Sequence, residues 1–140
     1  GQFQTEKLTG LVRELDPSRL IDQASGWFDQ GGGDLKSIHN YFFALKAVPD
    51  ENRAVALSEI GGYTLRQEEH SACEKLYGYS AYKDRDSLNR AYAELMKKVK
   101  KLIPEGLCAS VYTQWSDIEE EINGIYTYDR EIRKIEVPDL

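Results

Sequence analysis

The stretch Ala54–Gly62, AVALSEIGG, decides how the rest of the chain is interpreted. It opens with apolar residues, contains no proline and closes on a Gly-Gly pair. A short apolar run ended by a glycine turn is typical of a buried strand in a parallel sheet. Glu59 would then lie at the carboxyl end of that strand, where α/β folds bind ligands and carry catalytic residues. A second interpretation, that Glu59 only caps the next helix or pairs with an arginine, has equal weight from position alone.

The composition is that of a globular chain: of 140 residues, 41% are hydrophobic and 30% are charged. This length suits one ordinary domain, so we expect residues 1–140 to form a single domain. The net charge of −6, with no basic cluster beyond one lysine-rich helix end, argues against nucleic acid as a partner. No apolar run approaches the roughly 18 residues that cross a membrane, so we expect no membrane partner. No secretory signal opens the chain, which favours a cytoplasmic location, while Cys73 and Cys108 leave the redox compartment undecided.

The spacing of apolar residues predicts two helices and four strands. A helix face runs from Leu8 to Leu15, and a longer helix runs from Asp86 to Ile103. The strands are expected at residues 19–24, 35–40, 54–59 and 107–114. Strands alternating with helix-length segments favour a parallel sheet with crossover helices. Because a (β/α)₈ barrel needs about 250 residues, we expect an α/β fold that is half of a TIM barrel, with about four parallel strands and outer helices.

Polar and aromatic residues follow each predicted strand. Trp27 follows the first strand, His39 and Tyr41 the second, Glu59 ends the third, and Trp115 follows the fourth. In a barrel these strand ends share one rim, and aromatic walls beside a carboxylate suit a sugar ring. Each residue also has a structural interpretation, because an aromatic residue near a strand end is more often packing and a lone histidine more often a hydrogen-bonded structural residue.

The sequence gives little support to other kinds of site. Its two histidines have a spacing that fits no common metal pattern, so we expect no metal. The run Gly31–Gly33 is not followed by the Gly-Lys-Ser/Thr of a phosphate loop, and no serine lies in a Gly-x-Ser-x-Gly elbow. We therefore expect no cofactor.

Four segments follow one another along the chain: LDPSRLIDQASGW (15–27), GDLKSIHNY (33–41), AVALSEIGGY (54–63) and ASVYTQWSDIEEEINGIYTYDRE (109–131). Together they resemble the later part of glycoside hydrolase family two, which includes β-galactosidases, β-glucuronidases and β-mannosidases. The resemblance covers nearly the whole chain, and several motifs in order are more specific than one motif alone. It implies a (β/α)₈ catalytic barrel and a retaining β-glycosidase.

The resemblance also implies a role for each matched residue. Glu59, in SEIGG, matches the nucleophile after strand seven, and Tyr41 resembles the tyrosine after strand six that orients it. His39 belongs to the same His-x-Tyr motif and is expected to line the sugar site. Trp27 and Trp115 resemble aromatic residues of the rim, but the segment YTQWSD departs from the usual strand-eight motif, so the Trp115 match is the less secure one.

One departure from the family concerns the general acid. The family's acid/base glutamate follows strand four in an Asn-Glu pair that often continues as NEGWGQF, whereas this chain opens with Gly1-Gln2-Phe3. We therefore expect the acid to lie upstream, in a longer enzyme of which this chain is the carboxyl-terminal half-barrel, inactive alone. Retaining hydrolysis needs two carboxyl groups about 5 Å apart. Asp34 and Asp117 are the nearest substitutes by strand position, but neither matches the family's acid.

Two other hypotheses stay open: a non-catalytic carbohydrate-binding or assembly module, and a small α/β protein in which Glu59 is purely structural. Under the enzyme hypothesis, the expected partners are a carbohydrate substrate and the remaining half of the barrel. A half barrel would leave open sheet edges and an apolar inner face, so we also expect self-association.

Overall fold

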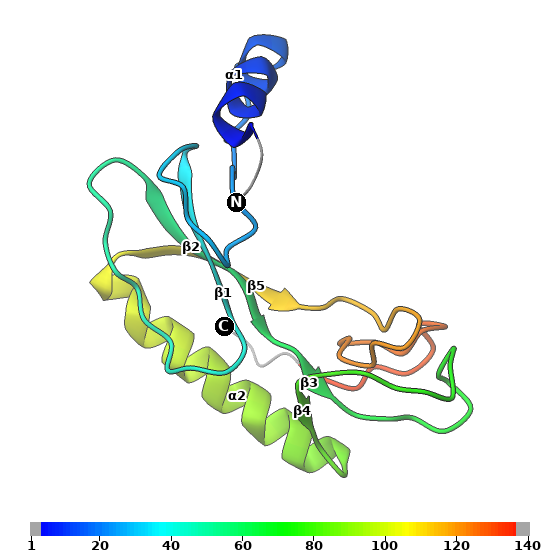
Figure 1. Cartoon of the computed structure of the whole chain (residues 1–140). Coiled ribbons are helices and arrows are strands. Elements are labelled where there is room, and N and C mark those ends of the chain that lie inside the picture. Colours follow the sequence, from blue (N-terminus) through cyan, green and yellow to red (C-terminus); the bar gives the residue numbers. More distant parts are fainter. Residues whose placement is uncertain (1–3, 137–140) are drawn as a thin grey trace. The chain divides into compact units, whose positions relative to one another are not determined.

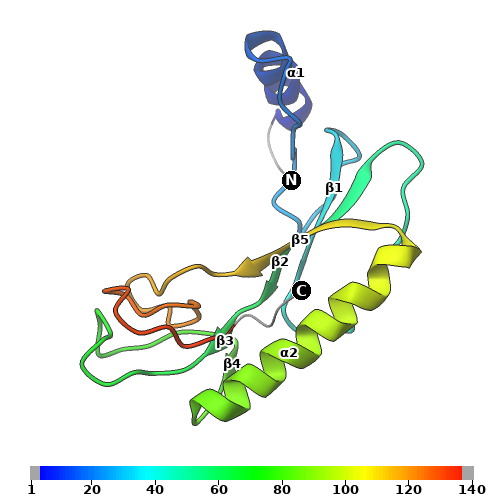
Figure 2. The same ribbon diagram turned by 180° about the vertical axis from the view of Figure 1, so that it is seen from behind.

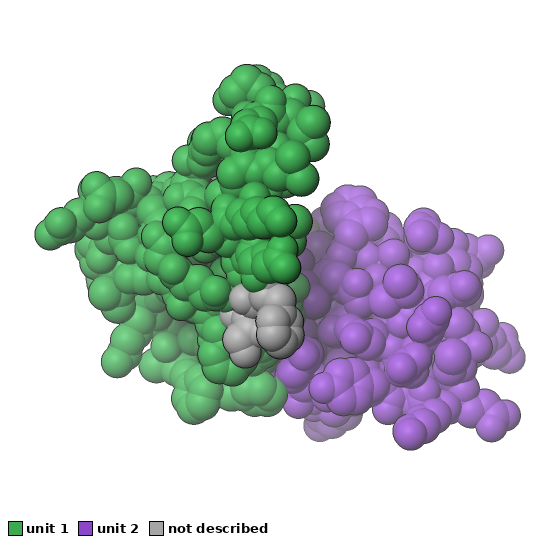
Figure 3. Space-filling view, turned by 45° about the horizontal axis from the view of Figure 1, so that its top comes forward, with its two compact units in different colours: residues 1–59, 101–110 green, residues 60–100, 111–140 purple. Residues whose placement is uncertain are grey.

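The computed structural model describes residues 4–136 (Figure 1 and Figure 2). Its elements are α1 (Thr5–Leu15), β1 (Leu35–Asn40), β2 (Ala54–Gly61), β3 (Tyr63–Thr64), β4 (Ser80–Ala81), α2 (Arg85–Leu102), the 3₁₀ helix η1 (Ile103–Glu105) and β5 (Leu107–Thr113). The chain divides into two compact units, one of residues 1–59 and 101–110 and one of residues 60–100 and 111–140 (Figure 3). The opening Gly1-Gln2-Phe3, which carries the expected match to the acid/base motif, lies outside the described residues.

The first unit is built on a sheet in which β2 lies between β1 and β5. β1 and β2 begin side by side, because the Ala54 N–H donates to the Asp34 carbonyl at 3.0 Å. Val55, Ala56 and Leu57 are successive residues no more than 4% exposed, the pattern of a strand covered on both faces. The predicted strands at 35–40 and 54–59 are confirmed, and the strand predicted at 107–114 forms β5, one residue shorter.

The prediction of half a TIM barrel with about four strands and outer helices is wrong. The main sheet has three strands, and α1 and α2 are the α-helices of residues 4–136. Residues 19–24 form no strand, because the loop before β1 takes both main-chain groups of Ile21: its N–H donates to the Asp34 carboxylate and its carbonyl accepts from the Asp34 N–H, each at 2.8 Å. The connection from β1 to β2 forms no helix either, and it contains Pro49, which disfavours one.

Helix α1 forms where the spacing of its apolar residues predicts it, and it ends at Asp16 before Pro17. It buries no residue, and the four residues of its apolar face, Leu8, Leu11, Val12 and Leu15, are 46% to 76% exposed. Arg13 ties the helix to the loop before β1 by a 2.9 Å ion pair with Asp34. Polar contacts rather than apolar burial therefore hold α1 in the first unit.

The second unit packs around α2, whose amino-terminal end lies by the β3–β4 pair in Figure 1 and Figure 2. Asp84 caps the helix, because its carboxylate accepts the Ser87 N–H at 2.7 Å, and Gly106 follows η1 at φ 106°. The helix face buries Leu88 and Tyr92. The core of the unit consists of Leu65, Leu88, Tyr92, Ile125 and Ile135.

Residues 114–136 complete this core without a helix or a regular strand. Isolated parallel bridges join Tyr77 to Glu121 and Ser116 to Tyr126, and an antiparallel bridge joins Tyr126 to Arg133. These bridges hold the loops of this segment together. Neither α1 nor α2 has the length and apolar character that a membrane-spanning helix needs.

Candidate functional site

Glu59 lies inside β2, two residues before the strand ends at Gly61. Its side chain is 43% exposed, although Leu57, two residues before it, and Ile60, directly after it, are fully buried. The buried neighbours fix the strand, and an exposed carboxylate on a fixed strand can meet a ligand. This is the carboxylate that sequence analysis selected as the nucleophile.

Two side chains from the end of β1 meet the same carboxylate oxygen. The Tyr41 hydroxyl donates to Glu59 Oε2 at 2.6 Å, a distance typical of a hydrogen bond to an ionised group. His39 Nδ1 lies 3.2 Å from that oxygen, and the histidine side chain is only 9% exposed. The histidine contact is not aligned as a hydrogen bond, so Nδ1 has no hydrogen-bond partner within residues 4–136. The buried ring nitrogen therefore faces the carboxylate of Glu59.

Trp27 completes this group from the loop before β1. Its ring lies 5.8 Å from the His39 ring, edge to face, and 6.2 Å from the Tyr41 ring, centroid to centroid. It is 48% exposed, so part of the indole faces solvent. The loop approaches β1 closely at Gly26, where a Cβ atom would lie 2.1 Å from His39 Cδ2, and the Gly26 carbonyl accepts the His39 N–H at 3.0 Å. Only glycine allows this approach.

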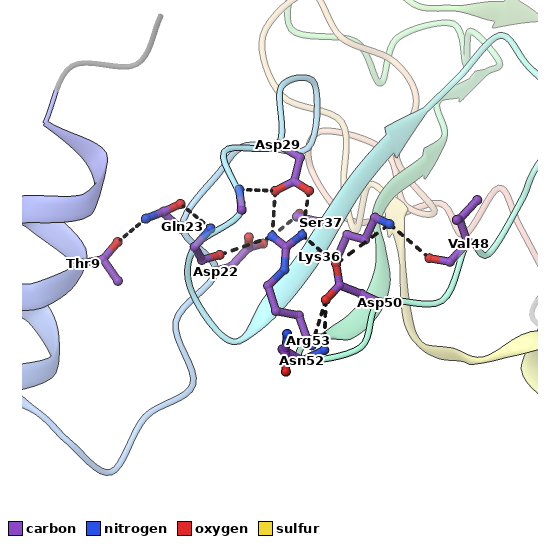
Figure 4. A network of polar contacts seen from close by, with 12 residues as sticks. Thr9, Asp22, Gln23, Asp29, Lys36, Ser37, Val48, Asp50, Asn52 and Arg53 are labelled. Atoms are coloured by element: carbon purple, nitrogen blue, oxygen red, sulfur yellow. Dashed lines mark hydrogen bonds and ion pairs between the residues drawn. The ribbon is translucent and has the colours of Figure 1, made fainter.

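A polar network that sequence analysis missed anchors the Trp27 loop (Figure 4). The Arg53 guanidinium, at the start of β2, donates twice to Asp29, to Oδ1 and Oδ2 at 2.7 Å each, and donates to Asp50 Oδ2 at 2.8 Å. Asp29 Oδ1 also accepts the Gly31 N–H at 2.9 Å. Hydrogen bonding to Arg53 holds the pKa of Asp29 well below its usual range. The Asp-x-Gly turn was readable in the sequence, but its arginine partner, 24 positions away, was not.

A second polar contact joins β1 to β2 behind the site. The Ser37 hydroxyl donates to Asp22 Oδ2 at 2.9 Å, and it also contacts the Ser58 hydroxyl across the two strands. Ser37 is 5% exposed, so this contact is buried. It fixes the register of β1 against β2, and that register carries His39 and Tyr41 to Glu59.

The two carboxylates considered as substitute acids are engaged elsewhere. Asp34 accepts the Ile21 N–H and pairs with Arg13, and these contacts lower its pKa, whereas a general acid needs a raised pKa. Asp117, in the second unit, is 4% exposed and binds Lys134. Both aspartates therefore have structural partners.

The predicted residues Trp27, His39, Tyr41 and Glu59 are thus brought together in the first unit. Trp115 belongs to the second unit, where its ring lies 5.3 Å from the Tyr126 ring and its side chain is 68% exposed. A comparison of the sequence with models of protein families finds no match, and no curated protein matches it at a significant level.

Proposed function

We propose that this chain contributes the nucleophile to a retaining β-glycosidase, of the β-galactosidase-like class that the sequence resembles. The observation that supports the proposal is the 2.6 Å hydrogen bond from the Tyr41 hydroxyl to Glu59 Oε2, with His39 Nδ1 3.2 Å from the same oxygen. A carboxylate held in one orientation and partly exposed can attack a sugar carbon without first reorganising.

Each residue has a separate role in the proposed reaction. With Oε2 held by Tyr41, Glu59 Oε1 attacks the anomeric carbon, the bond from that carbon to the leaving oxygen breaks, and a covalent glycosyl-enzyme forms. His39 packs beside the Glu59 carboxylate and lines the sugar site, and Trp27 offers an aromatic face to the ring's C–H surface. Water then attacks the anomeric carbon, gives a proton to the residue that served as general acid, and breaks the bond to Glu59, which leaves as a carboxylate.

The reaction also needs a general acid to protonate the leaving oxygen. In a retaining enzyme that carboxyl group lies about 5 Å from the nucleophile. In the proposal it comes from a segment outside residues 4–136. The chain by itself should therefore turn over an aryl β-glycoside negligibly.

A second candidate function is carbohydrate binding without chemistry. The half-exposed Trp27 ring favours it, because an indole packed against His39 and Tyr41 is a platform for a sugar whether or not a bond breaks. The two functions differ in what they require of Glu59, since binding alone needs no nucleophile.

The test uses the longer enzyme that the proposal requires, with a panel of gluco-, galacto-, manno- and glucurono-configured substrates. Glu59→Gln should reduce turnover of aryl β-glycosides on the order of 10⁴-fold or more, because an amide cannot replace the attacking carboxylate. Glu51→Gln is the matched control, since Glu51 is an exposed glutamate of the loop before β2 and should leave turnover unchanged.

A mechanism-based probe separates the two functions. A 2-deoxy-2-fluoro glycoside with a dinitrophenolate leaving group needs little acid assistance, so it should label Glu59, as seen by mass spectrometry of the peptide. Labelling of another carboxylate, or nearly full activity in a folded Glu59→Gln variant, would rule out Glu59 as the nucleophile. Sugar binding that survives Glu59→Gln and is lost in Trp27→Ala, with no label formed, would support the binding module instead.

A further inference from the structure

Three possible metal-binding side chains meet in the second unit. His70 comes from the loop after β3, and Asp129 and Glu131 come from the turn near residue 130. One ligand atom from each residue lies within 4.8 Å of the other two, and His70 Nδ1 is 2.6 Å from Asp129 Oδ2. His70 and Asp129 are 59 positions apart, so no spacing pattern in the sequence could show the cluster.

The Asp129 carboxylate is held in place from behind. Its Oδ1 accepts the Thr127 hydroxyl at 2.6 Å and the Glu131 N–H at 3.1 Å, which leaves Oδ2 directed at His70. Thr127 is fully buried, and its hydroxyl oxygen accepts the Ile132 N–H at 3.1 Å. The anchor therefore comes from a buried residue that is not itself a ligand.

We propose that His70, Asp129 and Glu131 bind one divalent transition-metal ion of the zinc type. One imidazole nitrogen with two carboxylate oxygens is a donor set that zinc accepts, whereas calcium and magnesium prefer oxygen alone. Tetrahedral ligands about 2.0–2.1 Å from zinc lie about 3.3 Å from one another. The 2.6 Å between His70 Nδ1 and Asp129 Oδ2 must open by about 0.7 Å to reach that spacing. The exposed Glu131 side chain must close a distance of at most 4.8 Å, a shift of up to about 1.5 Å.

Metal binding at Nδ1 fixes the position of the His70 proton and leaves one coordination position of the ion free. With Nδ1 on the ion, the neutral ring carries its proton on Nε2. Three protein ligands leave the fourth position of a tetrahedral ion to water or an exogenous ligand. This site does not depend on the proposed role of Glu59, because all three ligands belong to the second unit.

The test titrates zinc into the chelator-treated chain and measures binding by competition with a chromophoric chelator. Cys73 and Cys108 are free thiols that bind zinc themselves, so both are first replaced by serine. We expect one ion per chain, a higher midpoint of thermal unfolding with zinc, and no such effect of magnesium.

The variants assign the ligands. Glu131→Gln should weaken zinc binding at least tenfold, and it keeps the backbone N–H that supports Asp129. His70→Ala should abolish saturable binding. Glu68→Gln is the matched control, because Glu68 is an exposed glutamate of the same loop as His70, and it should leave the affinity unchanged. Absence of saturable binding, or equal affinity in Glu131→Gln and Glu68→Gln, would show that the cluster is only a hydrogen-bonded loop contact.

Discussion

Lys134 is the residue whose replacement should destabilise the second unit most. The side chain is fully buried, and its ammonium group donates to both Asp117 oxygens, at 2.7 and 2.9 Å, and to the carbonyls of Leu65 and Ile122 at 3.2 and 2.8 Å. Lys134→Met keeps the length of the side chain and removes the charge. It leaves the Asp117 carboxylate with the Gly124 N–H, at 2.7 Å, as its remaining hydrogen-bond donor within residues 4–136.

The expected loss is about 3–5 kcal/mol of unfolding free energy, because the remaining partner is a buried charge without a counter-ion. That is a large share of the roughly 5–15 kcal/mol that stabilises a typical domain. Burial raises the pKa of Asp117 and lowers the pKa of Lys134, so each ion depends on the other to stay charged. The double variant Asp117→Asn/Lys134→Met removes both charges together and should recover most of the loss.

The sign of the pH dependence follows from the same pair. Without the ammonium group, the folded state should hold a proton on Asp117 more tightly than the unfolded state does, since burial already raises its pKa above 3.8. The Lys134→Met variant should therefore lose stability, relative to wild type, as the pH rises above 3.8 toward the raised pKa of the folded state.

Urea unfolding measures these differences, with Trp115 fluorescence in a Trp27→Phe background as the reporter of the second unit. Lys97→Met is the control: Lys97 is 67% exposed in its pair with Glu94. Its loss should cost no more than about 0.5 kcal/mol. A loss for Lys134→Met as small as that of the control would contradict the assigned role of the buried ion pair. A double variant destabilised by the sum of the two single changes would also contradict it, because the charges would then not interact.

Three further predictions concern the first unit and the whole chain. Tyr41→Phe should lower turnover of the longer enzyme by about 10- to 100-fold, less than Glu59→Gln does, because it removes one charge-assisted hydrogen bond of about 1–3 kcal/mol. Arg53→Lys should lower the free energy of unfolding in urea by about 1 kcal/mol, because lysine cannot donate to both oxygens of the partly exposed Asp29. An unchanged midpoint would show that the Arg53–Asp29 network does not stabilise the first unit. Light scattering should find species heavier than 16.0 kDa, because the apolar face of α1, from Leu8 to Leu15, is exposed; a monomer at high concentration would contradict this self-association.

Helices and strands with a clear periodic pattern of apolar residues could be predicted from the sequence. Segments whose secondary structure depends on tertiary contacts could not. β1, β2, β5 and α2 lie within a few residues of their predicted bounds, because each carries a clear apolar pattern. Residues 19–24 have a similar composition, but their hydrogen bonds go to Asp34, which no local pattern reveals. The short pair β3–β4 escaped prediction because two-residue strands have no period to read.

The residues of the candidate sites also fall into those that the sequence could select and those that it could not. His39, Tyr41 and Glu59 could be selected from the sequence because each lies at or near the end of a strand, and motifs in a fixed order supported them. Trp27 was selected as the residue after a predicted strand that does not form, so only the ordered motifs support its selection. Arg53 with Asp29, and His70 with Asp129, could not be selected, because each pair joins loops across tens of positions. Loop-to-loop contacts of charged residues depend on the finished fold, whereas strand ends depend on local pattern.

The error in the barrel prediction affects the proposed general acid but not the proposed nucleophile. The contact between Tyr41 and Glu59 requires only that β1 and β2 be neighbours in one register, and the observed sheet meets that requirement with three strands. The nucleophile proposal therefore does not depend on a barrel.

The expected position of the general acid did depend on a barrel, since a barrel rim would have brought a strand-four carboxyl group to Glu59 by topology alone. Without that topology, the acid must be located by chemistry: a carboxyl group about 5 Å from Glu59 with a raised pKa. A structure of the longer enzyme with the fluorinated glycosyl group on Glu59 would identify it directly.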